Sequence, residues 1–501
     1  MTYFLWSLPT LIVLTTIVSG RVNTTIAAAL GLMSAIPVAM LCSPIAFDAG
    51  QLDEALRRGL WIGAIVAPYV LGGLMFWQVA ARAPSGHTAD ISPVDSPAVE
   101  KSETLLAKRR LVFFACFLVG PFAESATGYG VGMLGTVMLI RRFGFAPRHL
   151  MVFALLSQTV IPWGAMSSGT LLAAAYARIP ATQLGLYTMM PVALLMLVWL
   201  CLFWRTARQA GLEAPRSENL RELGWIGTCM LFLAVTTATF GPEIALLAAY
   251  GPLIVVRYLI DRRPNRHQIL VATHKVLPYV ILIGCMSLTR LVPWLRDNLS
   301  SLFRISPFAD LPAWAPFFHA GSWLIAGSVV TACARAQGRF LGQEAGTAWR
   351  TGRHAVFTVF LFAMMAEVLT AAGISKAFAV ATFNALGEKA ILLTPLLTGT
   401  FGILTNSGNS ANSLFLPSQV ALAIQAGLSI PAVAALQQAS GMSLGIFSPV
   451  RMSIAATLSG GHGQERIVYV QLLPFAAMAL TLMMGLAVCV ITGVSFSVNA
   501  R

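Results

Sequence analysis

Charged residues are scarce in this sequence. Only 10% of the 501 residues are Asp, Glu, Lys or Arg, whereas 57% are hydrophobic. A soluble globular chain has roughly 25% charged residues, so the composition excludes a water-soluble protein. The seven cysteines lie singly, and no pair has the spacing of metal ligands. This excludes a zinc-type site and favours cysteines that act as small buried hydrophobic residues.

The sequence contains many long apolar runs. Each is close to the ~20 residues that a helix needs to cross the hydrocarbon core of a bilayer. Because membrane-spanning chains must satisfy their backbone polar groups internally, and short alternating strands are absent, the sequence predicts an all-α polytopic membrane protein with about 12 transmembrane helices. The first run lacks the features of a cleaved signal peptide and is expected to be a retained helix. The runs cover 3–19, 24–42, 59–80, 184–204, 223–240, 268–289, 354–373 and 467–494.

The net charge of +14 comes from basic residues in short loops between the apolar runs. This is the pattern of the positive-inside rule and not of a nucleic-acid-binding surface. The only long polar stretch, 81–110, is rich in Pro, Ser and mixed charge and is expected to be a cytoplasmic linker. No cofactor is expected, and the bilayer is the one partner that the composition itself predicts.

Two segments interrupt the regular series of spans. Segment 111–140 is rich in glycine, and placing the basic loops in the cytoplasm makes it start and end on the cytoplasmic side. Segment 389–424 has two apolar arms around a polar centre and starts and ends outside. We therefore predict two re-entrant hairpins that enter from opposite faces, as in transporters built from inverted repeats. The predicted division is 1–80 as N-terminal helices, 81–110 as linker, 111–260 as first repeat, 261–353 as connecting helices and 354–501 as second repeat.

The first hairpin contains Gly130, Gly132 and Gly135 in the spacing of a dinucleotide-binding loop. Such a loop must follow a strand and open a helix in a βαβ unit. Here the preceding residues, "LVFFACFLVGP", form an apolar membrane segment. The glycines are better explained by a tight bend and close helix approach.

Two acidic residues in apolar surroundings are the candidate proton-coupling groups. Glu124 lies in "GPFAESATGYG" and Glu367 in "FLFAMMAEVLTAAG". Ionisable residues at membrane depth are costly and usually lie on a polar pathway. The substrate is expected to be held by hydroxyl and amide groups and by helix N-termini, because few basic residues lie deep in the apolar runs. The candidate substrate-binding residues are Ser125, Thr127, Gly128, Gly130, Ser407, Asn409, Ser410 and Asn412.

With these residues the sequence resembles the L-lactate permease family of bacterial secondary transporters. The resemblance rests on "FAESATGYGVG", "NSGNSANSLFLPSQ" and "SGMSLGIFSPVRMSIA". It implies proton-coupled transport of L-lactate, glycolate or a related 2-hydroxymonocarboxylate across the bacterial inner membrane. The chain departs from the family at Ser407-Gly408-Asn409, where the best-known members have Gly-Ser-Asp. It departs again at Leu444–Phe447, which replaces a Gly-Lys pair.

Other functions remain open at the level of sequence. A sodium-coupled carrier of another small organic anion would have the same hairpins, and a channel would conduct without accumulating its substrate. An intramembrane enzyme would need a serine with a base, paired aspartates or an H-E-x-x-H motif, and none of these is present. The sequence does not indicate an oligomeric state.

Overall fold

The structure is a computed structural model that describes residues 2–82, 104–128, 130–262 and 264–493. Within these ranges the regular structure is helical, apart from one isolated bridge between Ile305 and Trp314. The all-α polytopic architecture predicted from the apolar runs is confirmed.

Three helices precede the first hairpin. Asp48 caps the third of them, because its carboxylate accepts the Gln51 N–H while the Gln51 side chain accepts the Asp48 N–H. α3 then packs along α16 over much of its length. The bounds are α1 Thr2–Val18, α2 Thr24–Cys42 and α3 Ala49–Ala81.

The first predicted hairpin is present and is followed by a broken span. Its first arm is continuous from α5 to α6, and α7 returns beside it. The next span bends by 58° between its two parts, Pro147–Leu156 and Ile161–Ala177. The elements are α5 Leu105–Phe114, η1 Ala115–Val119, α6 Gly120–Thr127, α7 Val131–Ile140, η2 Arg141–Phe143, α8 Pro147–Leu156, η3 Ile161–Trp163 and α9 Gly164–Ala177.

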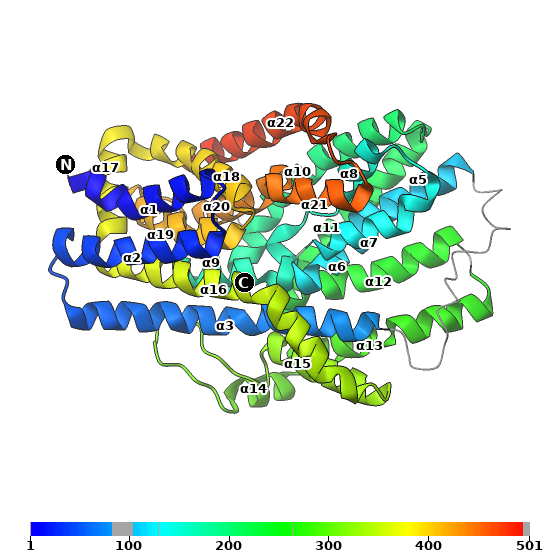
Figure 1. The fold of residues 1–501 in the computed structure, drawn as a ribbon, viewed down its shortest axis with the longest axis horizontal. Coiled ribbons are helices and arrows are strands. Elements are labelled where there is room, and N and C mark those ends of the chain that lie inside the picture. Colours follow the sequence, from blue (N-terminus) through cyan, green and yellow to red (C-terminus); the bar gives the residue numbers. More distant parts are fainter. Residues whose placement is uncertain (1, 83–103, 129, 263, 494–501) are drawn as a thin grey trace.

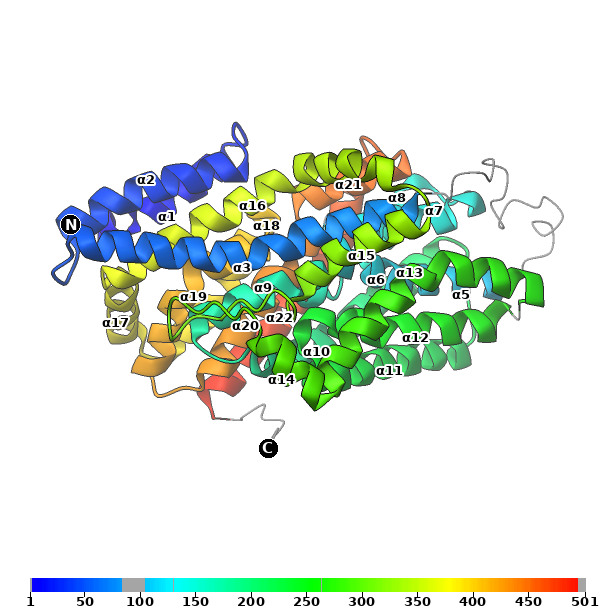
Figure 2. The same cartoon turned by 90° about the horizontal axis from the view of Figure 1, so that it is seen from below.

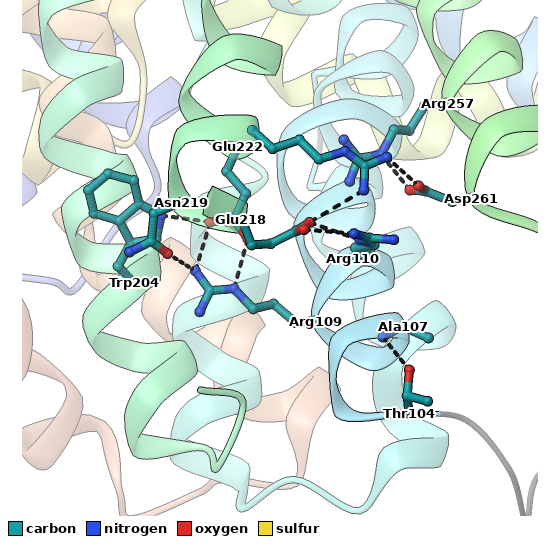
Figure 3. A network of polar contacts seen from close by, with 11 residues as sticks. Thr104, Ala107, Arg109, Arg110, Trp204, Glu218, Asn219, Glu222, Arg257 and Asp261 are labelled. Carbon is teal, nitrogen blue, oxygen red and sulfur yellow. Dashed lines mark hydrogen bonds and ion pairs between the residues drawn. The ribbon is translucent and has the colours of Figure 1, made fainter. Parts of the chain in front are cut away.

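The predicted linker 81–110 is too long at its C-terminal end. Residues 105–110 form the start of α5, which Thr104 caps by accepting the Ala107 N–H at 3.2 Å. Arg109 and Arg110, which the sequence places in a solvated segment, instead make ion pairs with acidic residues of α11 (Figure 3). Residues 83–103 of that linker lie outside the described residues.

The middle of the chain contains four long helices, a sharp bend into a short helix, and two further helices that lead to the second half. The bend of 92° separates Val276–Leu291 from the short α14, which starts at Pro293 and was not predicted. The elements are α10 Ala181–Gln209, α11 Arg216–Phe240, α12 Pro242–Arg262, α13 Arg266–Leu291, α14 Pro293–Ser301, α15 Ala320–Ala334, η4 Gly338–Phe340 and α16 Leu341–Ala371.

The last part repeats the order of hairpin, broken span and straight helix. α18 and α19 form the second hairpin, close to the predicted 389–424, and the next span is broken between α20 and α21. The elements are α17 Ile374–Leu386, η5 Gly387–Leu392, α18 Leu393–Thr405, α19 Gly408–Gln425, α20 Ile430–Ser443, η6 Leu444–Phe447, α21 Pro449–Ser459 and α22 Glu465–Ile491.

The described residues contain nine helices long and apolar enough to cross a membrane, or up to eleven if each bent pair is one span. This is slightly fewer than the twelve predicted, because the apolar helices α1 and α15 have only 17 and 15 residues.

The two hairpins enter the molecule from opposite ends. α5 and α7 approach from one end, whereas α19 of the second hairpin lies toward the other end, beside α17 (Figures 1 and 2). The broken spans α8–α9 and α20–α21 run between them, and α9 contacts both α6 and α19. The tips of the hairpins therefore meet the broken helices in the interior of the molecule.

Candidate functional site at the hairpin tips

Glu124 lies at the tip of the first hairpin and binds the backbone of the returning arm. The residue is 3% exposed. Its Oε1 accepts the Gly130 N–H at 3.1 Å, and its Oε2 accepts the Gly132 N–H at 3.0 Å. The start of a helix leaves such N–H groups unpaired, and the helix dipole favours a negative charge there. The carboxylate thus closes the turn between α6 and α7.

Glycine is required at this turn. Gly128 and Gly130 have φ values of 73° and 77°, in the left-handed region that side chains disfavour. A Cβ on Gly128 would lie 2.6 Å from the Cβ of Ala165 in α9. The glycine spacing in the sequence therefore belongs to a bend between two helices, as predicted, and not to a loop after a strand.

Two hydroxyl groups of the first hairpin already have backbone partners. Ser125 Oγ donates to the Phe122 carbonyl at 2.6 Å, and Thr127 Oγ1 donates to the Ala123 carbonyl at 3.4 Å. Both residues are buried. The structure brings them together with Glu124, but their hydroxyl protons are engaged within α6.

The second hairpin turns at Asn406, which has a φ of 54°. Ser407 caps α19, because its Oγ accepts the Ser410 N–H at 3.3 Å. The Asn412 amide donates to the Gly169 carbonyl of α9 at 3.4 Å. A Cβ on Gly169 would lie 2.6 Å from Oδ1 of Asn409. The four predicted polar residues of this hairpin thus gather where α19 begins, against α9.

The kink of α9 lies between the two hairpins. Ala165, Met166 and Ser167 have φ values of 45° to 55°, outside the helical region, and two helical parts meet at this kink. Ala165 faces Gly128 of the first hairpin, whereas Gly169, one turn later, faces the second. Both hairpin tips therefore contact the same short segment of α9, at its kink.

Around the second hairpin, three buried side-chain amides use their N–H groups but leave their oxygens without a partner. Asn412 Oδ1, Gln437 Oε1 and Gln438 Oε1 are buried and unpaired. The Gln437 amide donates to the Ala411 carbonyl at 3.2 Å, and the Gln438 amide donates to Thr170 Oγ1 at 2.6 Å. These partners fix the amide orientations, so the unpaired atoms are acceptors.

Arg451 is a buried residue of this region that was not among the predicted site residues. It lies in the first turn of α21 and is 8% exposed. Its guanidinium lies against Gly445, since a Cβ there would be 3.3 Å from Nη1. The Ser448-Pro449 pair was the available signal, because serine as N-cap and proline in the first turn mark a helix start and place Arg451 inside a span.

Glu367, the second predicted coupling group, lies elsewhere. It is 4% exposed and pairs with Arg58 at 3.0 Å and with Arg178 at 3.2 Å. Asp310 also bonds both arginines, and the hydrogen bond from Arg58 holds the pKa of the Asp310 carboxyl below its usual range. Arg178 directly follows the last residue of α9. The rise of a helix of this length places Arg178 about 20 Å from the first residue of α9. The structure therefore does not bring Glu367 to Glu124.

A second ion-pair network joins the outer part of the first hairpin to α11 (Figure 3). Arg109 donates to both carboxylate oxygens of Glu222, each at 2.8 Å. Trp204 of α10 donates to the same carboxylate at 2.7 Å. Arg110 pairs with Glu218 at 2.8 Å. These bidentate, buried contacts fix the direction in which the arm enters.

Two cavities lie away from the tips. One of about 340 Å³ is beside the first hairpin and is lined by Lys108, His149 and Gln209 among others. The other, of about 530 Å³, is lined by Glu54, Arg57, Trp61 and Phe308. The second adjoins the cluster of Glu367, because the Arg58 guanidinium lies 5.1 Å from the Phe308 ring centroid.

No protein-family model and no curated protein matches this sequence. Among solved structures, the fold is similar to the crystal structure of the YdaH transporter of Alcanivorax borkumensis, described as having an unusual topology. The match covers 94% of this chain and 98% of that one, with a TM-score of 0.51 and 13% identity. The chain shares that fold. At this identity the similarity concerns the arrangement of helices and not the residues of a site.

Proposed function

We propose that the protein is a secondary transporter that imports L-lactate, glycolate or a related 2-hydroxymonocarboxylate together with protons. We place it in the bacterial inner membrane and in the L-lactate permease family. The observation that carries the proposal is Glu124: a buried carboxylate at the turn of a re-entrant hairpin, facing a broken span. The solved transporter with the same fold supports the general class.

Glu124 couples proton binding to the shape of the hairpin. As a carboxylate it accepts two backbone N–H bonds across the turn. When one oxygen is protonated, it becomes an O–H donor and a weaker acceptor, so the bond that it accepted is weakened. Protonation from the more acidic side therefore loosens the turn against α9 and removes a negative charge that would repel an anionic substrate.

The second hairpin supplies polar contacts for the substrate. Ser410 Oγ is buried without a hydrogen-bond partner, and Asn409 borders α9. A 2-hydroxy acid presents a hydroxyl as well as a carboxylate, so it can use both donors and acceptors of this hairpin. We assign Ser407, Asn409, Ser410 and Asn412 to substrate contacts from this side, and Ser125, Thr127, Gly128 and Gly130 to the opposite side.

Purified protein in proteoliposomes tests this function. Labelled lactate and glycolate are offered with an inward proton gradient, an inward sodium gradient, or neither. We expect accumulation above the external concentration with the proton gradient alone, and faster uptake as external pH falls. Uptake that only equilibrates under every gradient would identify a channel and contradict the proposal.

Sodium coupling is the second candidate, and one observation favours it. Asn412, Gln437 and Gln438 present unpaired buried oxygens near the start of α19, and hard cations prefer oxygen ligands. The described residues contain no group of three His, Cys, Asp or Glu side chains placed to hold a metal ion, so neutral oxygens would have to coordinate the sodium ion. Accumulation driven by sodium and not by protons would support this alternative.

A further inference from the structure

Arg451 is a buried cation without a bound partner. Its Nη1 is inaccessible and makes no hydrogen bond, and no hydrogen bond or ion pair joins its side chain to another described residue. A buried charge without a partner costs several kcal/mol unless something compensates it. By contrast, each of the three guanidinium nitrogens of the buried Arg109 has an acceptor.

The surroundings of Arg451 favour an anion. It lies in the first turn of α21, an 11-residue helix whose N-terminus is positive. Ser448, which caps that helix, is also buried. The guanidinium extends back over Gly445, where the absence of a side chain leaves it room. Helix N-terminus and guanidinium thus direct their donors to the same break between α20 and α21.

The first hairpin brings an acidic residue close to α21. Gly130, which binds Glu124, lies near Ile454, one turn after Arg451 on α21. Glu124 and Arg451 make no ion pair within 4 Å in the part of the chain that the structure describes. While Glu124 is ionised, its negative charge offsets the positive charge of Arg451 from a distance. When Glu124 is protonated, the positive charge of Arg451 is no longer offset.

We propose that Arg451 binds the carboxylate of the transported anion, in the break between α20 and α21, when Glu124 carries a proton. Release of that proton restores the charge balance between the two residues and expels the anion. The inference rests on the proposed function and adds a charged ligand to the neutral donors predicted from the sequence. A planar guanidinium suits a carboxylate, which can accept two parallel N–H bonds.

The test measures binding and stability in the same variants. We expect Arg451→Gln to weaken the binding of labelled lactate to detergent-solubilised protein by about 10- to 100-fold. Arg451→Lys keeps the positive charge but loses the forked guanidinium. Its affinity for lactate should therefore lie between those of wild type and Arg451→Gln. Arg466→Gln, on the exposed start of α22, is the matched control and should bind as wild type does.

Stability without ligand separates this role from a structural one. Replacing an arginine that stabilises the fold would lower the melting temperature. Replacing an unpartnered buried arginine should leave the melting temperature unchanged or raise it. We therefore expect Arg451→Gln to melt at or above the wild-type temperature without ligand and to lose the stabilisation by lactate. Unchanged lactate affinity in Arg451→Gln, or a lower ligand-free melting temperature, would overturn the inference.

The same experiment distinguishes failure of the function from failure of the site. Wild-type protein that neither binds nor transports lactate and glycolate would contradict the proposed substrate. In that case acetate, pyruvate and succinate serve as probes of thermal stabilisation. A carboxylate that stabilises wild type but not Arg451→Gln still supports the site, and equal stabilisation of both proteins rejects it.

Discussion

At the scale of single residues, a substitution of Glu124 should separate two parts of transport, which are accumulation driven by a pH gradient and exchange of substrate. A glutamine at this position keeps one oxygen as a backbone acceptor but cannot release a proton. We expect Glu124→Gln to abolish accumulation driven by a pH gradient, while exchange of internal for external substrate continues, because the side chain resembles the protonated form. Counterflow and gradient-driven uptake in the same proteoliposomes measure the two parts.

Glu213 provides the control for that change. It is an exposed acid between α10 and α11, so Glu213→Gln should accumulate substrate as wild type does. If Glu124→Gln also accumulates substrate against its gradient, coupling belongs to another group, and Glu367 is the next candidate.

The partners of Glu367 give its variant a different expected result. Glu367→Gln leaves Arg178 with Asp310 as its acidic partner, and Arg58 with Asp310 and a 3.9 Å contact to Glu54. Breaking a buried ion pair is destabilising, but the two arginines are 17% and 31% exposed, so we expect a loss of about 1–3 kcal/mol. The melting temperature should fall and gradient-driven accumulation should remain. Normal stability with lost accumulation would instead assign coupling to Glu367.

The sequence indicated Glu124 and the polar residues of both hairpins, because each is polar within an apolar run. It did not indicate Arg451, since a basic residue near the end of a run looks like a loop residue. It also could not show that Ser125 and Thr127 donate to their own helix, or that Glu367 meets Arg58 and Arg178. Those contacts depend on how distant segments pack, and hydropathy carries no information on packing.

At the scale of elements, the turn of the first hairpin depends on Gly128. Alanine there would adopt a φ of 73° and place its methyl 2.6 Å from the Ala165 Cβ. We expect Gly128→Ala to reduce the initial rate of uptake at least tenfold, because the tip must withdraw from the α9 kink. Gly135→Ala in the same hairpin is the control, since its Cβ would meet nothing within 4 Å. Equal rates in the two variants would show that this contact is not needed for transport.

Both hairpins were predictable because glycine and clustered polar residues interrupt apolar runs where the backbone leaves a regular helix. Helix ends within polar sequence were less predictable. Residues 105–110 look like a linker, but ion pairs with Glu218 and Glu222 on α11 keep them helical. α14 is likewise amphipathic and short, and its sequence resembles a loop between two spans.

At the scale of the whole molecule, the opposite entry of the hairpins relates the fold to alternating access. The loops after α7 and before α18 lie at opposite ends of the molecule (Figure 1). With the basic loops in the cytoplasm, the first loop faces the cytoplasm and the second faces outward. A substrate bound between the tips would then be separated from each side by one hairpin, and movement of either hairpin would open one path.

Cysteine labelling tests this arrangement in intact cells and in inverted membrane vesicles. The seven native cysteines are first replaced, and single cysteines are introduced at two exposed positions, Ala146 after α7 and Glu388 before α18. A membrane-impermeant maleimide should label Glu388→Cys in cells and Ala146→Cys only in inverted vesicles. Permeabilised cells should label both, which controls for accessibility. If both cysteines react from the same side, the hairpins enter from one face, and transport by opposed hairpins is ruled out.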